Sequence, residues 1–133
     1  MLDLFSLLYV SQSTAPDAAD VIAIADESQS NNQRDSITGL LLFDGKCWCQ
    51  YIEGPQRAVA DLYARLQRDS RHCNMSVLQH GRAPEERAFP NWRMGYAFVA
   101  DEHAIAKVLS GDRADALNVM RAAHRLSTRA SGT

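Results

Sequence analysis

The 133-residue sequence has none of the short motifs that mark the commonest nucleotide, zinc and acyl-transfer sites. It contains no Walker loop, no GxGxxG, no HExxH and no GxSxG. Glycine-rich loops of the first two kinds present backbone amides to phosphates, paired histidines of the third kind bind zinc, and the fourth exposes a nucleophilic serine. Their absence excludes the commonest enzymes of these three classes.

Cysteine is scarce, and its spacing argues against both a disulfide framework and a zinc site. The three cysteines, Cys47, Cys49 and Cys73, form no CxxC. Cys47 and Cys49 would share one face of a strand, where neighbouring Cβ atoms cannot form an unstrained disulfide. His72 precedes Cys73, but this spacing matches no common zinc pattern. We therefore predict free thiols, no bound metal and a reducing compartment.

Strong positive charge and long hydrophobic runs are also missing. The net charge is −2 and Lys and Arg are dispersed, whereas a nucleic-acid site is usually basic and localised. The longest apolar runs, such as ITGLLLF (37–43), are too short to span a bilayer, and no signal sequence opens the chain. With 46% hydrophobic and 23% charged residues, we predict one cytoplasmic domain that binds neither nucleic acid nor membrane.

Apolar periodicity predicts a strand and a helix at the start of the chain. Residues 2–10 have the composition of a strand, and the turn-like SQSTAPD (11–17) follows. Apolar residues recur at helical spacing over 21–28, and Asn31 and Asn32 continue the same face. This helix therefore has an apolar stripe that becomes polar in its last turn.

A hairpin is predicted next. The runs 36–43 and 46–54 are both strand-like. They are joined by Asp44-Gly45, and Asp-Gly tolerates the positive φ angles of a two-residue type I′ turn. We therefore expect the two strands to pair directly with one another.

The remaining elements complete an α+β fold. Pro55 suits the first position of a second helix, whose inward-facing residues are Val59, Leu62, Tyr63 and Leu66. Strands are predicted near 75–81 and 91–99, and two short helices over 101–109 and 112–126. This order predicts a ferredoxin-like βαββαββ sheet with two helices on one face, plus two short C-terminal helices.

Several polar side chains fall on faces that should be apolar. Gln50 stands between Trp48 and Ile52 on one strand face, where an unmet amide group costs about 1–3 kcal/mol. The others are Tyr9 on the first strand, Ser28, Asn31 and Asn32 on the first helix, and Arg65 and Asp69 on the second. If both helices cover one sheet face, these groups converge between them. Such a pocket suits a flat heterocycle, because Asn and Gln amides match the edge of a flavin or a purine.

Five segments of the chain resemble the BLUF family of blue-light sensors that use FAD. They are LLYVS (7–11), NNQRDSITGLLLF (31–43), CQYIEGP (49–55), LQRDSRH (66–72) and RAFPNWRM (87–94), in the family's order and spacing. The resemblance covers about residues 2–98. It implies a flavin-binding photosensory domain over 1–98 and a C-terminal helical extension over 99–133 within the same globular unit.

The resemblance also implies roles for individual residues. Tyr9 would donate an electron and a proton to the excited flavin, and Gln50 would rearrange its hydrogen bonds after illumination. Trp92 and Met94 match a pair that exchanges places near the glutamine during signalling. The implied flavin-binding positions are Ser28, Asn31, Asn32, Gln50, Arg65, Asp69, Arg71 and His72.

The implied function is that of a blue-light photoreceptor with no enzymatic activity. FAD would be the cofactor, and a changed hydrogen bond to the flavin would shift its absorption slightly to the red. The signal would pass to a separate protein through the sheet face away from the flavin and the C-terminal helices. We expect a homo-oligomer, a dimer or larger.

Two other functions stay open. Acylphosphatases share the ferredoxin-like topology, but SQSTAPD (11–17) lacks the glycines and the arginine with which their loop holds an anion. A flavin-free binding module could keep the same fold. In that case Tyr9, Asn32 and Gln50 would be buried polar groups without a ligand, which is unfavourable. The colour of the purified protein discriminates between the sensor, which would be yellow, and the flavin-free module, which would be colourless.

Overall fold

The structure is a computed structural model. It describes residues 4–14, 27, 31, 34–44, 46–69, 72–82, 87, 95–98, 117, 118, 120 and 122. Of residues 13, 72 and 95–98 it describes the backbone alone. Most of the predicted first helix and the predicted helix over 101–109 lie outside the described residues. No helix in the described part of the chain is both long and apolar enough to cross a bilayer.

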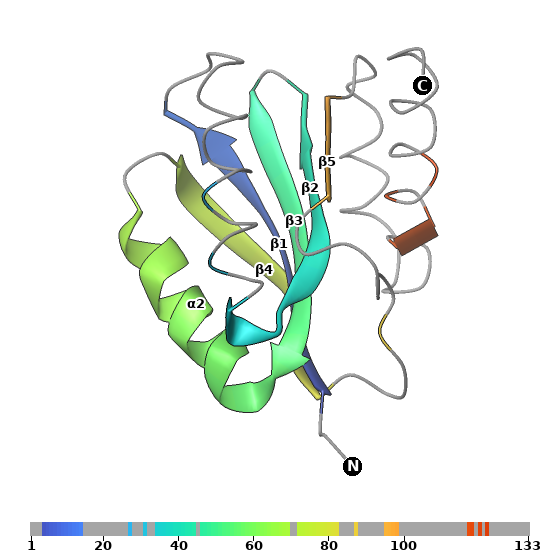
Figure 1. The fold of residues 1–133 in the computed structure, drawn as a ribbon. Coiled ribbons are helices and arrows are strands. Elements are labelled where there is room, and N and C mark those ends of the chain that lie inside the picture. Colours follow the sequence, from blue (N-terminus) through green and yellow to red (C-terminus); the bar gives the residue numbers. More distant parts are fainter. Residues whose placement is uncertain are drawn as a thin grey trace.

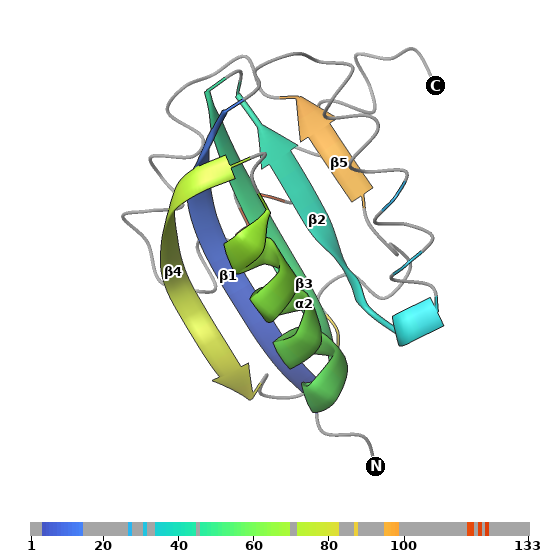
Figure 2. The same ribbon diagram turned by 90° about the vertical axis from the view of Figure 1, so that its left-hand side faces the viewer.

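Five strands form one sheet in the order β4-β1-β3-β2-β5 (Figure 2). They are β1 (Leu4–Ser13), β2 (Thr38–Phe43), β3 (Cys47–Pro55), β4 (His72–Arg82) and β5 (Gly95–Phe98). β2 and β5 are parallel, and every other neighbouring pair is antiparallel. The ferredoxin-like α+β fold is therefore confirmed, with β1 and β3 adjacent in the middle of the sheet.

The predicted hairpin is present, but its turn is displaced by one residue. The Asp44 backbone N–H donates to the carbonyl of Cys47 at 3.2 Å, so these two residues close the turn. The Asp44 carboxylate accepts the N–H groups of Lys46 and Cys47, at 2.9 and 2.7 Å. An aspartate at the first position of a turn satisfies backbone donors in this way. Asp44 therefore begins the turn, whereas the sequence predicted it at a central position.

The helix α2 (Gln56–Arg68) packs on one face of the sheet (Figure 1). Its predicted inward face is confirmed: Val59 is buried, and Leu62, Tyr63 and Leu66 are partly buried against the same core. Pro55 precedes the first helical residue, because its extended ψ of 145° keeps it in β3, opposite Leu4. The prediction that Pro55 is the first helical residue was wrong by one position.

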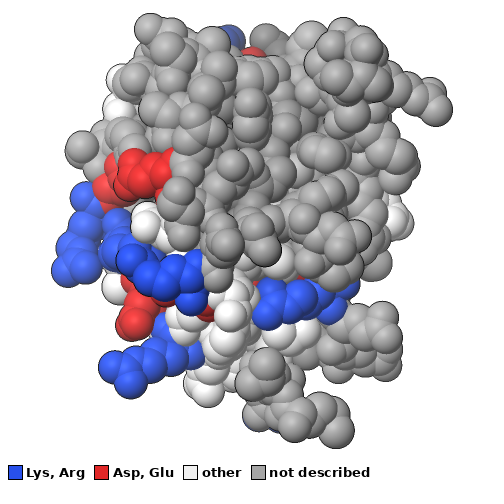
Figure 3. Space-filling model, viewed as in Figure 1, with Lys and Arg blue, Asp and Glu red and all other residues white. Residues whose placement is uncertain are grey.

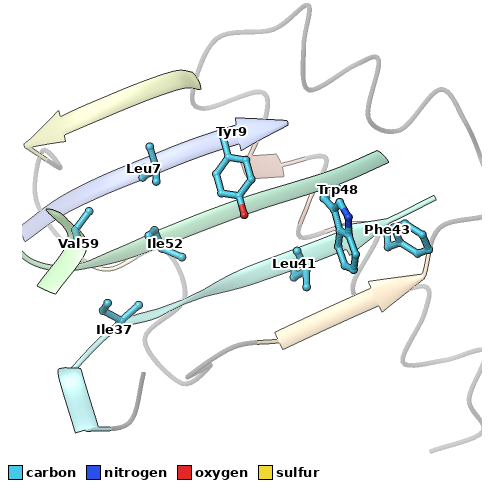
Figure 4. Close-up of a cluster of buried hydrophobic side chains, with 8 residues drawn as sticks. All are labelled: Leu7, Tyr9, Ile37, Leu41, Phe43, Trp48, Ile52 and Val59. Atoms are coloured by element: carbon cyan, nitrogen blue, oxygen red, sulfur yellow. The ribbon is translucent and has the colours of Figure 1, made fainter. Parts of the chain in front are cut away.

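One hydrophobic cluster lies between the sheet and this helix layer (Figure 4). Its buried members are Leu7, Tyr9, Ile37, Leu41, Phe43, Trp48, Ile52 and Val59. Strand alternation accounts for the cluster, because residues two apart share a face. We call the sheet face that carries Tyr9 and Trp48 the switch face.

The opposite face of the sheet, which we call the far face, is also buried. Leu40, Leu42, Cys49 and Tyr51 alternate with the switch-face residues and are almost inaccessible to solvent. Figures 1 and 2 place the described helical residues between 117 and 122 on this side, and both Leu117 and Met120 are buried. Four residues of the helix predicted over 112–126 are thus helical, and the far face is not an open surface.

Candidate functional site

Tyr9 and Gln50 meet at the centre of the switch face. Tyr9 on β1 lies opposite Gln50 on β3 in the antiparallel register. The Tyr9 hydroxyl donates a hydrogen bond to Gln50 Oε1, and in Figure 4 this hydroxyl points over β3. The two residues are only 3% and 5% exposed. The polar residue that interrupted an apolar face in the sequence therefore has a buried partner.

Apolar side chains enclose this pair. Trp48 and Ile52 flank Gln50 along β3, and Leu41 lies beside it on β2. Removal from water raises the pKa of the Tyr9 phenol above its ordinary value, and the negative charge of Asp69, together with that of Cys49 when the thiol is ionised, raises it further. A charged phenolate is disfavoured in such surroundings. Tyr9 therefore keeps its proton at any physiological pH.

The two predicted residues on α2 occupy different environments. Asp69 ends the helix, where its N–H donates to the carbonyl of Leu66 at 3.2 Å, and its charge acts on Tyr9. Arg65 forms an ion pair with Asp35, with 3.7 Å between Arg65 Nη2 and Asp35 Oδ2. Asp69 is therefore electrostatically coupled to the switch face, and Arg65 reaches the end of the first helix. The sequence did not predict the part played by Asp35.

The other predicted site residues are described only in part. Asn31 is helical and half-buried. The His72 backbone begins β4 and pairs with Ser13, and its side chain is not described. Ser28, Asn32, Arg71, Trp92 and Met94 lie outside the described residues. Their predicted roles stay predictions.

A cleft of about 660 Å³ lies between the end of the first helix and α2. It is lined by Arg34, Asp35, Pro55, Arg57, Ala58, Asp61, Ala64, Arg65 and Arg68. Charged residues of both signs gather over this side of the molecule (Figure 3). The cleft is thus strongly charged, and Tyr9 and Gln50 do not line it. The pocket predicted between the two helices depends on a first helix that lies mostly outside the described residues, so this cleft does not test that prediction.

Two buried polar groups next to the Tyr9–Gln50 pair test whether a ligand belongs there. Ser11 on β1 lies opposite Trp48 on β3, and both side chains are buried. Ser11 Oγ and Trp48 Nε1 find no hydrogen-bond partner within the described part of the chain. Such groups cost free energy when unmet, and ring atoms or hydroxyls of a flavin could satisfy both. The residues present therefore fit a polar, planar cofactor.

Sequence reasoning placed Trp48 on the same strand face as Gln50 but assigned it no role at the site, and it did not consider Ser11. Ser11 lies two positions beyond Tyr9. Strand alternation alone would have placed Ser11 on the same face as Tyr9. Trp48 also packs against Phe43, with 4.5 Å between the ring centroids.

None of the three cysteines forms a disulfide. Cys47, Cys49 and Cys73 are all free, as predicted. Burial raises the pKa of the Cys49 thiol to about 12, so it behaves as a small apolar side chain on the far face. Among the described residues, no group of three or more His, Cys, Asp or Glu side chains is placed to hold a metal ion.

Comparison with known sequences identifies relatives of this chain. Residues 4–95 match a family-wide sequence model described as "BLUF: Sensors of blue-light using FAD". The chain is similar to photoactivated adenylate cyclase subunit beta of Euglena gracilis, with 37% identity over 89 residues, or 66% of this chain. It spans only about 10% of the length of that relative.

Solved structures agree with the sequence match. BlrB, a BLUF protein in its dark state, superposes with a TM-score of 0.79 at 32% identity, covering 92% of this chain and 98% of BlrB. BlsA in its photo-activated state has a TM-score of 0.76 over 91% of this chain and 94% of BlsA. Its 22% identity supports the fold alone. The chain therefore belongs to the BLUF family of blue-light sensors that use a flavin.

Proposed function

We propose that Tyr9 and Gln50 form the light-driven switch of this blue-light sensor. The observation that carries the proposal is the buried hydrogen bond from the Tyr9 hydroxyl to Gln50 Oε1. A bound flavin would supply the absorption of blue light and would accept one electron with one proton. Tyr9 would give up an electron from its phenol ring and the proton of its hydroxyl, and it would recover both as the hydrogen bonds rearrange, so that the flavin is oxidised again in the lit state.

The raised pKa of Tyr9 decides how this transfer starts. Because burial keeps the phenol protonated, Tyr9 begins as a neutral donor and its proton leaves along the existing hydrogen bond. Gln50 Oε1 lies at the end of that bond, so the amide is the first group to receive the proton. A glutamine amide can bond in two orientations, and rotation or tautomerisation would leave it in a different hydrogen-bond pattern. That new pattern is the lit state.

We assign the other predicted positions around this pair. Asp69 would set the electrostatic potential at Tyr9, on which its charge already acts. Trp92 and Met94 would complete the switch near Gln50. Flavin binding is proposed for Ser28, Asn31, Asn32, Gln50, Arg65, Asp69, Arg71 and His72.

The first experiment is a visible absorption spectrum of the purified protein, in the dark and after blue light. We expect a flavin spectrum that moves slightly to longer wavelength and recovers in the dark. Gln50→Leu should keep the flavin and lose this shift, and Tyr9→Phe should lose it as well. The matched control is Tyr63→Phe, which alters a partly buried tyrosine on α2 outside the switch and should keep the shift.

Each other outcome has a definite meaning. A normal light-induced shift in Gln50→Leu would remove Gln50 from the switch, and an unchanged photocycle in Tyr9→Phe would contradict its role as donor. Protein that binds no flavin, even after FAD is added, would favour the flavin-free binding module. Extraction and chromatography of the bound flavin would distinguish FAD, which we propose, from FMN.

We further propose that the chain signals to a separate protein and has no enzymatic activity of its own. The photosensory domain would comprise residues 1–98, with 99–133 as a helical extension that covers the far face. The free cysteines favour a reducing compartment such as the cytoplasm. We propose a dimer or larger oligomer. Sedimentation of a monomer at tens of micromolar, in both dark and light, would refute that assembly.

A further inference from the structure

Arg87 joins three separate parts of the fold. Its Nη1 donates to Thr38 Oγ1 at 3.0 Å and to the Glu53 carbonyl oxygen at 3.4 Å. Its Nη2 donates to the Ser36 carbonyl oxygen at 2.8 Å. These acceptors belong to β2, to β3 and to the turn that follows the first helix. One guanidinium thus ties all three to the chain segment that leads towards β5.

The hydrogen bonds continue from Arg87 into the buried far face. Thr38 Oγ1 donates to Glu53 Oε2 at 3.1 Å, and the Tyr51 hydroxyl donates to Glu53 Oε1 at 3.3 Å. Because Arg87 donates to the Thr38 oxygen, the Thr38 hydroxyl proton is directed at Glu53. Glu53 and Tyr51 are inaccessible to solvent, and Thr38 is nearly so. Breaking this chain of bonds would leave buried polar groups unmet, which is costly.

This network lies directly behind the proposed switch. Tyr51 follows Gln50 in sequence and points to the opposite face, and Glu53 is two residues further along β3. Contact between β3 and the Ser36 turn is close: a Cβ atom at Gly54 would lie 3.0 Å from the Ser36 carbonyl oxygen. A displacement of β3 that extends from Gln50 to Glu53 would therefore change the distances that Arg87 spans.

β5 is a short strand at the edge of the sheet. It pairs with β2 alone, over the four residues Gly95–Phe98, and it forms the edge of the sheet (Figure 2). A short edge strand with one neighbour opens more easily than a central strand. Arg87 lies eight residues before Gly95, so a tether at Arg87 can influence how β5 is held.

We propose that Arg87 is a positioning residue for the photoswitch, which holds β2, β3 and the Ser36 turn in one arrangement. Through Thr38 and Glu53 it couples the hydrogen-bond state of Gln50 to β5 and sets how long the lit state lasts. This inference rests on the proposed function of Tyr9 and Gln50. It adds a far-face network, Arg87–Thr38–Glu53–Tyr51, to the pair on the switch face.

The first test measures dark recovery of the red-shifted absorption. Arg87→Gln should keep the red shift but recover faster, by about 2- to 30-fold, the range that network mutations produce. Arg87→Lys should restore part of the lifetime, because lysine keeps the charge and donors but not the planar fork. The control is Arg57→Gln, an exposed arginine on α2 that should recover at the wild-type rate. Wild-type recovery in Arg87→Gln would overturn the proposal.

A second test needs no photochemistry. In the dark protein, Arg87→Gln should speed amide hydrogen exchange at Gly95–Phe98 and leave β4 unchanged. Equal exchange protection of β5 in the wild type and the variant would overturn the proposed role of Arg87. This outcome can be read even if the wild type shows no red shift, so the two proposals are tested separately. If Arg87→Gln does not fold, Thr38→Val removes only the bridging hydroxyl and should give the same exchange pattern. Unchanged exchange in Thr38→Val would then refute the relay.

Discussion

The hydrogen bond between Tyr9 and Gln50 should appear as a coupling energy in stability measurements. Both side chains are buried, so Tyr9→Phe leaves Gln50 Oε1 without this donor. Loss of one partner from a buried pair costs about 1–3 kcal/mol, and Gln50→Leu should cost a similar amount for the same reason. Removing both partners leaves neither group unmet. The double variant should therefore be less destabilised than the sum of the two single variants, by about 0.5–3 kcal/mol.

The measurement is urea unfolding of the wild type, the two single variants and the double variant, in the dark. A double-mutant cycle is required because Tyr9 and Gln50 each have a further interaction, which the single variants also disturb. Subtraction around the cycle isolates the pairwise term. The urea dependence should be equal in all four proteins, which shows that the extent of unfolding is unchanged.

A matched cycle provides the control. Tyr63→Phe alters a partly buried tyrosine on α2, which packs edge-on against His80 with 4.8 Å between the rings. Combined with Gln50→Leu, it should give additive losses. If the Tyr9–Gln50 cycle is likewise additive to within about 0.3 kcal/mol, the hydrogen bond contributes nothing and the reasoning is refuted.

Three further predictions concern the core. Burial raises the pKa of the Cys49 thiol from about 9 to about 12. Below pH 9 this thiol should not affect the free energy of unfolding. Between pH 9 and pH 12 the unfolded state loses the proton and the folded state keeps it, so the free energy of unfolding should fall by about 1.4 kcal/mol per pH unit. Cys49→Ala should remove that part of the fall in alkaline urea titrations, and an unchanged slope would contradict it. Gly39→Ala should destabilise the protein by about 1–3 kcal/mol or more, because the added Cβ would lie 1.9 Å from the Tyr51 carbonyl oxygen. Thermal unfolding measures this loss. A loss no larger than that of Gly54→Ala would contradict the prediction. Val59→Ala should cost about 1.5–3 kcal/mol in the same assay through lost burial and a cavity, and a neutral effect would show that α2 repacks.

Features that depend on local periodicity could be predicted from the sequence. Alternation along β3 put Trp48, Gln50 and Ile52 on one face, and the 3.6-residue spacing of α2 gave its inward face. The hairpin was predicted because the turn signal and both strands are contiguous. Its one-residue displacement came from the Asp44 side chain, which binds backbone donors ahead of it and so begins the turn.

Contacts between distant segments could not be predicted in the same way. Arg87 reaches acceptors 34 to 51 residues away in sequence, and no local spacing encodes such a network. Arg65 forms an ion pair with Asp35, 30 residues earlier in the chain, which no helical spacing indicates. The coverage of the far face by Leu117 and Met120 likewise follows from the packing of the whole chain.

The central position of β1 determines when the site can assemble. Both neighbours of β1, namely β3 and β4, come later in the chain, and the Tyr9–Gln50 bond joins residues 41 positions apart. On a ribosome, the first strand therefore waits without partners until most of the sheet has been synthesised. Contacts of such long sequence separation form slowly, and unpaired strands are prone to aggregate meanwhile. Acquisition of yellow colour should thus be a late event in maturation, so that colour per polypeptide reports the yield of correct folding.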